Sequence, residues 1–92
     1  MAAALAATPA SGSITSVVSA VRVDLTGGDP TVAAYIQSTD GTITLRSPAF
    51  QPSSDGKYSW FNVIFPNSGT WTTTLRKSSD DTQLATLSLT VS

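Results

Sequence analysis

The chain has 92 residues and a net charge of −1, and 40% of its residues are hydrophobic while only 12% are charged. This length suits a single domain with one thin core, and the apolar content does not suit an intrinsically disordered chain. The sequence has no Cys, His or Glu, which excludes disulfide bonds, Cys/His zinc sites and catalytic systems built on a Cys or His side chain.

The N-terminal residues, MAAALAATPASGS, are almost all small. The Ala-rich start can form one helical turn but no stable isolated helix, because helix nucleation is costly. Neither a basic segment nor a long apolar segment is present, which argues against a signal peptide. We therefore predict a flexible N-terminal arm over residues 1–13, ordered only against another chain, and a folded domain over residues 14–92.

Strand signals begin after the arm. Residues 14–25 are rich in β-branched side chains, and from Val21 to Leu25 apolar and charged residues alternate with a period of two. Further strands are predicted over 31–38 and 42–46, joined by a hairpin turn at Asp40-Gly41. The segment SPAFQPSSDG that follows is irregular, and we expect its Phe50 to plug one end of the core.

The second half of the chain contains three more predicted strands, over 57–65, 70–76 and 82–91, joined by short polar turns. No segment has a helical period. A single sheet would leave its apolar face open to water, whereas two facing sheets cover each other. The predicted fold class is therefore all-β, a β-sandwich of about six to seven antiparallel strands.

The strand predicted over 57–65 has apolar residues on both faces. One face would carry Tyr58, Trp60 and Ile64, and the other would carry Phe61, Val63 and Phe65. Only one set can face the core, so the other set needs the loop around Phe50 or another protein to cover it. The pattern leaves open which face points inward.

Residues 56–91, GKYSWFNVIFPNSGTWTTTLRKSSDDTQLATLSLTV, resemble the last three strands of immunoglobulin-like domains found on tailed-phage virions. The likeness rests on a strand followed by a Pro and Ser68-Gly69 turn, then on the strand that begins at Trp71. The Cys pair and the strand-C Trp of antibody domains are absent. The resemblance implies an immunoglobulin-like sandwich that serves as a non-enzymatic structural protein of the virion.

The resemblance further implies a capsid decoration or head-stabilising protein on the capsid surface, made in the host cytoplasm. Its partner would be the major capsid protein or another virion protein, and it would be a homo-oligomer, for which the resemblance suggests a trimer. An alternative is a carbohydrate-binding or adhesion module of a phage tail or bacterial surface protein.

The remaining polar residues indicate no catalytic, metal or cofactor site. The six Asp residues lie in or beside predicted turns, where such side chains usually accept hydrogen bonds from their own backbone. The segments SSDDT and SSDG lack the ligand spacing of a dedicated calcium loop. The basic residues are scattered, so we expect neither nucleic acid nor membrane as a partner.

The candidate partner-binding residues are therefore those of the arm and of the two-sided strand. They are Ala2, Ala3, Ala4, Leu5, Ala6, Ala7, Tyr58, Trp60 and Phe61.

Overall fold

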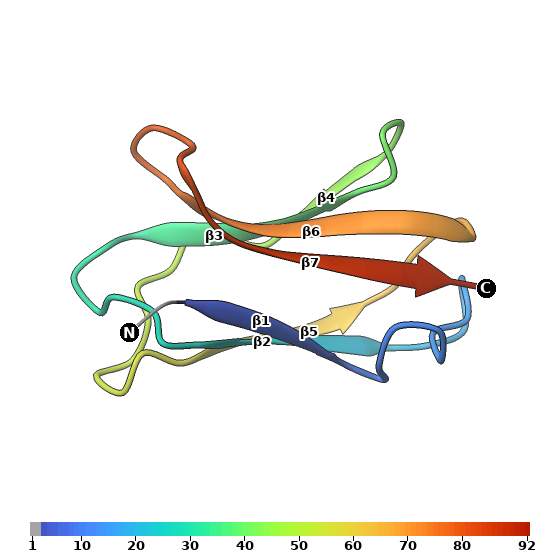
Figure 1. The fold of residues 1–92 in the computed structure, drawn as a ribbon, viewed down its shortest axis with the longest axis horizontal. Helices are drawn as coiled ribbons and strands as arrows, with labels where there is room; N and C mark the ends of the chain where they lie inside the picture. The colour runs from blue at the N-terminus through green and yellow to red at the C-terminus, as the bar shows by residue number, and fades with distance from the viewer. Residues whose placement is uncertain (1–2) are drawn as a thin grey trace.

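A computed structural model describes residues 3–92, and within them it contains seven strands in two antiparallel sheets (Figure 1). The smaller sheet has the order β1 (Ala4–Thr8), β2 (Val21–Thr26) and β5 (Tyr58–Val63). The larger has the order β4 (Thr44–Arg46), β3 (Ala34–Thr39), β6 (Gly69–Lys77) and β7 (Gln83–Val91). No helix that could span a membrane occurs in the described part of the chain.

The two sheets lie one above the other as the layers of a β-sandwich (Figure 1), so the predicted all-β class is confirmed. The strand orders correspond to A-B-E and C-F-G of immunoglobulin-type sandwiches, whose sheets are ABED and CFG, and no strand of the described residues takes the place of D in the smaller sheet. In this comparison β4 takes the place of an additional strand beside C, as in variable-type domains.

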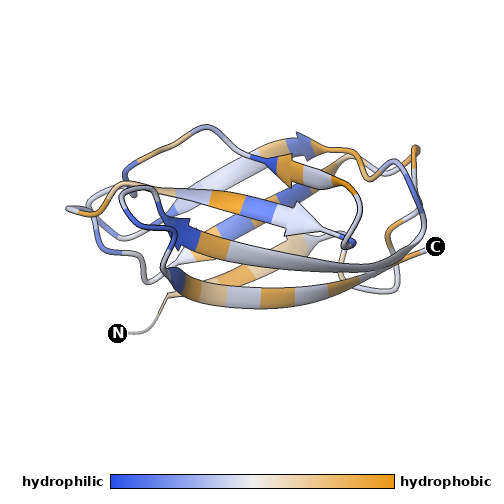
Figure 2. Ribbon diagram, turned by 90° about the horizontal axis from the view of Figure 1, so that it is seen from above, coloured by the Kyte–Doolittle hydropathy of each residue, from blue (hydrophilic) through white to orange (hydrophobic). Residues whose placement is uncertain are grey.

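The core lies between the sheets, and the predicted period of two builds most of it, with hydrophobic and hydrophilic residues alternating along the strands (Figure 2). Val21, Val23 and Leu25 point inward from β2, and Trp71, Thr73 and Leu75 point inward from β6. Trp71 is fully buried, packs its ring against Phe65 at 5.0 Å between centroids, and donates its indole N–H to the backbone oxygen of Asn67 at 3.0 Å.

Two hydroxyl groups are buried among these apolar side chains. Ser38 on β3 and Thr73 on β6 face each other, and their hydroxyl oxygens lie 2.9 Å apart. Because each hydroxyl has the other as a hydrogen-bond partner, neither is left unsatisfied in the core. This bond ties the two central strands of the larger sheet together.

The prediction of a flexible arm over residues 1–13 is wrong for the part that the structure describes. Residues Ala4–Thr8 form β1, which pairs with β2 from Ala4 opposite Thr26 to Thr8 opposite Arg22. Leu5 is only 8% exposed and belongs to the core. The alternation of polar and apolar residues in ALAAT is weak, because Ala occurs readily in both buried and exposed positions. Leu5 is the one large side chain of this strand that anchors it in the core. These residues are part of the sandwich.

The predicted strand over 14–25 is also shorter than expected. Ile14 is fully buried and forms a parallel bridge with Val91, but residues 15–19 then make a turn, and β2 starts only at Val21. Ser19 donates its backbone N–H to the oxygen of Thr15 at 3.0 Å, which closes this turn. The β-branched composition of the segment therefore does not translate into a continuous strand.

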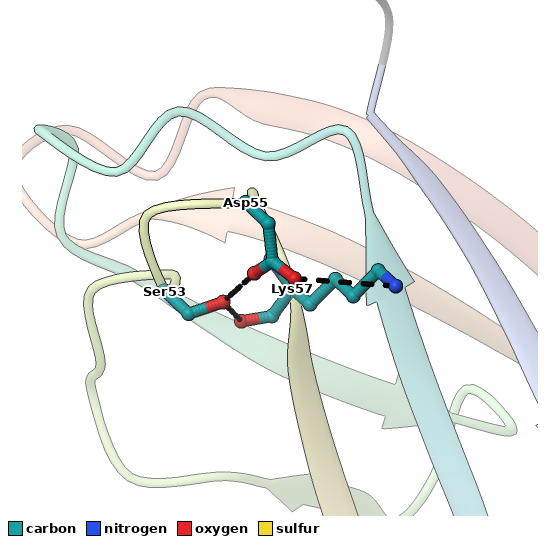
Figure 3. A network of polar contacts seen from close by, with 3 residues as sticks. All are labelled: Ser53, Asp55 and Lys57. Carbon is teal, nitrogen blue, oxygen red and sulfur yellow. Dashed lines mark hydrogen bonds and ion pairs between the residues drawn. The ribbon is translucent and has the colours of Figure 1, made fainter.

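Two loops meet at the end of the sandwich where β1 begins. The N–H of Gly28 donates to the oxygen of Gly56 at 2.9 Å, and a side chain at Gly56 would meet the Gly28 oxygen at 2.7 Å. The turn before β5 is held by Ser53, whose hydroxyl lies within hydrogen-bond distance of the Asp55 carboxylate and of the Lys57 backbone oxygen (Figure 3). The Asp55 and Ser53 side chains therefore shape this turn.

Candidate interaction surfaces

The two-sided strand predicted over 57–65 changes face partway along its length. On β2, two steps lead from Val21 to Val23, whereas on β5 three steps separate their partners Val63 and Trp60. One extra residue therefore bulges out of β5, and Asn62 there adopts a left-handed backbone with φ of 58°. The bulge reverses the alternation of side chains on either side of it.

The consequence is that parts of both predicted faces point inward. Before the bulge, Tyr58 and Trp60 pack against the core; after it, Val63 and Phe65 are buried. The side chains left outside are Phe61, 63% exposed, and Ile64, 45% exposed. The sequence allowed either the odd-numbered or the even-numbered residues of this strand to face the core. Neither alternative is right, because each assumes a strand without interruption.

A second exposed apolar pair lies beside this region. Val17 and Val18 are 67% and 76% exposed, and the N–H of Val17 donates to the backbone oxygen of Phe65 at 2.8 Å. This bond fixes the 15–19 turn next to the segment that carries Ile64. Val17 has a φ of 66°, which is unusual for a β-branched residue.

We call Val17, Val18, Phe61 and Ile64 the apolar end of the molecule, because they lie in the turn before β2 and at the end of β5, which the Val17–Phe65 hydrogen bond joins. Beside Phe61 on the outer face of the smaller sheet, Asp24 accepts hydrogen bonds from Arg22 at 2.9 Å and Ser59 at 2.6 Å. The apolar end therefore has a polar neighbour whose charges are already paired. An exposed apolar surface bordered by polar residues is typical of interaction sites.

A groove of about 410 Å³ separates the edges of β4 and β5. Trp60, Asn62 and Ile64 line one side, and Thr44, Leu45 and Arg46 line the other. The Arg46 guanidinium donates one hydrogen bond to the Gln37 side chain at 2.8 Å and lies 4.9 Å from the centre of the Tyr35 ring. Trp60 contributes an indole N–H to the lining and Asn62 contributes an amide, opposite the Thr44 hydroxyl.

The outer face of the larger sheet is nearly free of charge over β6 and β7. Paired across these strands are Thr70 with Thr90, Thr72 with Ser88, and Thr74 with Thr86. At the far end of β6 the Tyr35 hydroxyl donates to the Asp81 carboxylate, and Arg76 donates to the Asp81 backbone oxygen at 3.1 Å. The bond to Asp81 raises the pKa of Tyr35, and burial raises it further.

Three of the six carboxylates accept hydrogen bonds from the backbone of their own turns, as predicted, namely those of Asp29, Asp40 and Asp80. The other three accept from side chains instead. Asp40 accepts from the N–H groups of Thr42 and Ile43 at 2.9 and 2.8 Å, which lowers the pKa of Asp40. Hydrogen bonds from Thr31 and Thr82 likewise lower the pKa of Asp29 and of Asp80. No group of three or more potential metal ligands occurs among residues 3–92.

The structure does not bring the predicted partner-binding residues together. Ala2 lies outside the described residues. Ala3 and Ala7 are partly buried, Ala4 and Ala6 are exposed on β1, and Leu5 is core. Tyr58 stacks on Phe50 with 3.6 Å between ring centroids, so the expected plug covers Tyr58. Of the predicted residues, Trp60 and Phe61 lie at the groove and the apolar end.

The sequence did not indicate that Val17, Val18 and Ile64 are exposed, because all three lie in predicted strands where either face could point into the core.

A comparison of the chain with protein-family models, with curated proteins and with solved structures gave no match. The geometry described above and the resemblance of residues 56–91 are therefore the observations on which a function can be proposed.

Proposed function

We propose that this chain is a non-enzymatic structural protein of a virion that decorates a phage capsid by binding the major capsid protein. The observation that carries the proposal is the exposure of Phe61, which is 63% accessible on a folded 92-residue domain. Aromatic residues are enriched in the centres of protein interfaces, where they act as anchors. The resemblance to virion domains gives the class of partner.

The apolar end is suited to this role by its shape and its surroundings. Phe61 lies at the β-bulge and Ile64 directly after β5, and the turn that carries Val17 and Val18 is hydrogen-bonded to Phe65 beside them. Burying them against a protein would remove apolar surface from water. Many copies on one capsid would add their contacts and stabilise the shell against internal pressure.

Capsid co-sedimentation tests this proposal. We expect the chain to pellet with capsids of the phage that encodes it, and Phe61→Ser together with Val18→Ser to abolish this binding while the circular dichroism spectrum stays unchanged. The matched control is Leu84→Ser, since Leu84 is an exposed apolar residue at 40% but lies outside the apolar end. Loss of binding in the control alone, or no binding to any virion protein, would contradict the proposal.

A second candidate function, binding of a neutral carbohydrate, is favoured by the groove between β4 and β5. Its wall carries the Trp60 indole and the Asn62 amide. A concave site with an aromatic surface and a few polar groups is the usual form of a small-ligand site. This reading corresponds to the tail or surface-adhesion alternative.

The carbohydrate reading has its own test on a glycan array. Asn62→Gly keeps the left-handed backbone that the bulge needs and removes only the amide, so we expect it to abolish glycan binding without unfolding the domain. Phe61→Ser should leave glycan binding intact, because Phe61 does not line the groove. Absence of glycan binding by the unaltered chain would reject this candidate and leave the first one standing.

A further inference from the structure

The sandwich has four sheet edges, and three of them are short or interrupted. β4 has three residues and carries Arg46, β1 has five residues followed by Pro9, and β5 contains the bulge before Val63. Short length, charge, proline and bulges are the usual devices that keep an edge from pairing with another chain. β7 is different, because its nine residues, QLATLSLTV, include no charge and no proline.

The pairing of β7 shows which of its backbone groups point outward. Thr90 donates its N–H to the Ser11 hydroxyl at 2.8 Å and accepts from the N–H of Gly12 at 3.0 Å. Ser92 likewise exchanges bonds with Ile14 and Ser16. Residues that alternate along an antiparallel strand direct their N–H and C=O groups to the same edge. Thr86 and Ser88 therefore also direct theirs away from β6.

No described residue forms a hydrogen bond with these outward groups of Thr86 and Ser88. The free stretch has definite ends. On one side, the Ser11-Gly12 segment occupies Thr90; on the other, an extra residue at Leu84 breaks the regular pairing between Leu75–Ala85 and Arg76–Gln83. The edge thus presents two donors and two acceptors in a strand of regular geometry.

We propose that β7 pairs with β7 of a second copy of this chain, antiparallel and across a two-fold axis at Leu87. Thr86 of each copy would then face Ser88 of the other, and the two donors and two acceptors of each copy would all be used. Leu87 would meet Leu87 on the inner side, where this side chain is only partly buried in one copy.

Three features make a second copy the occupant. Cross-strand pairs would match hydroxyl with hydroxyl on the outer face and Leu with Leu on the inner face. No charged residue lies on β7, so self-pairing brings no like charges together. A two-fold axis allows the same surface to serve both partners, which is the commonest arrangement of homo-oligomers. In this register Leu84 would lie opposite Thr90 of the other copy, so the ladder ends where Ser11 and Gly12 already bond to Thr90.

This inference does not depend on the proposed function, and it predicts a dimer where the virion resemblance suggests a trimer. The ladder is short, so the contact is expected to be weak in dilute solution. It would strengthen where copies are concentrated on a repeating surface, because the second contact becomes intramolecular.

Sedimentation equilibrium of the full chain over a wide concentration range tests the pairing. We expect a monomer–dimer equilibrium, with Ser88→Lys raising the dissociation constant at least about tenfold, because it brings like charges together across the axis. The matched control is Thr72→Lys, which adds the same charge on the same face opposite Ser88 but on a strand with no free edge. It should change the constant less than about threefold, as a substitution outside the contact.

Amide hydrogen exchange of the unaltered chain gives a second measurement that needs no variant. The N–H groups of Thr86 and Ser88 should become protected as the concentration rises, while that of Thr90 should be protected throughout, since it is already bonded to Ser11. The proposal is overturned if the chain stays monomeric or forms a trimer, or if the two Lys variants raise the dissociation constant equally. It is also overturned if the exchange rates of Thr86 and Ser88 do not depend on concentration.

Discussion

β5 and β6 follow each other along the chain, contain the two Trp residues, and use their apolar side chains differently. In β6, the face with Trp71, Thr73 and Leu75 points into the core without interruption. In β5, one extra residue changes which face is inward. β6 therefore leaves no large apolar side chain outside, whereas β5 leaves Phe61 exposed.

The comparison shows that composition alone does not determine where exposed apolar surface lies. Both strands have enough apolar residues to fill a core face, and only the continuity of the pairing separates them. A bulge leaves one residue unpaired and changes the face of the sheet to which the neighbouring side chains point. In this domain the re-aimed residues form the apolar end, so the candidate contact surface is a product of strand irregularity.

The largest difference between the two strands should appear on truncating their aromatic residues. Trp71→Ala removes a fully buried ring, its packing on Phe65 and its hydrogen bond to Asn67, and should lower the free energy of unfolding by about 3–5 kcal/mol. Phe61→Ala removes an exposed ring and should change it by less than about 0.5 kcal/mol. Urea denaturation of both variants measures the two values.

Equal losses in these two variants would mean that Phe61 is covered within the isolated domain. A loss below about 1 kcal/mol for Trp71→Ala would place Trp71 at the surface and contradict the inward face of β6.

Next in size is the effect of removing the anchor of β1. Leu5→Ala should lower the free energy of unfolding by about 2 kcal/mol, because Leu5 is a core residue of the smaller sheet. Ala6→Ser, on the exposed side of the same strand, serves as the control and should be nearly neutral. Thermal unfolding measures both. An unchanged melting temperature for Leu5→Ala would restore the flexible arm that the sequence suggests.

The sequence predicts most of the sandwich because most strands have an uninterrupted period of two. Val21 to Leu25 places apolar residues at alternate positions, Trp71 to Leu75 places Trp, Thr and Leu there, and no other periodicity competes with this pattern. β1 escapes prediction for a physical reason. Ala is nearly as compatible with a loop or a helical turn as with a strand, so pairing with β2, a tertiary effect, decides its conformation.

The candidate surfaces are harder to predict than the fold. Nothing in the letters around Phe61 marks a bulge except Asn62, a residue that tolerates a left-handed backbone better than most. The exposure of Val17 and Val18 is also hard to predict, because β-branched residues are expected to lie in a strand. The unpaired edge of β7 depends on where residues 11–16 return along the sheet, which local sequence patterns do not contain.

A smaller effect on stability is expected from substitutions of Asn62, and it should show whether the fold requires the bulge in β5. Asn62 has a φ of 58°, which costs a β-branched residue about 1–2 kcal/mol relative to Gly. Asn62→Val should therefore destabilise the domain by about this amount, and Asn62→Gly should be close to neutral. If both variants are equally stable in urea, β5 does not need the bulge, and Phe61 can rotate inward.

The smallest expected effect lies at the far end of β6, where the following turn is tied to β3. Tyr35 donates its hydroxyl proton to the Asp81 carboxylate, and this bond raises the pKa of Tyr35. The folded-state pKa is above the unfolded value, so the stability it contributes is complete below the ordinary tyrosine pKa, near 10. It is lost as the pH rises through the raised value.

Asp81→Asn should move the pKa of Tyr35 down toward its ordinary value, since the largest cause of the shift is removed. Ultraviolet titration of the two Tyr residues measures this, with Tyr58→Phe used to isolate the Tyr35 signal. The Asp81→Asn variant should also lose less stability than the unaltered chain between neutral and strongly alkaline pH. If the substitution leaves the pKa of Tyr35 unchanged, burial alone raises that pKa. The turn after β6 is then not held to β3 through Asp81.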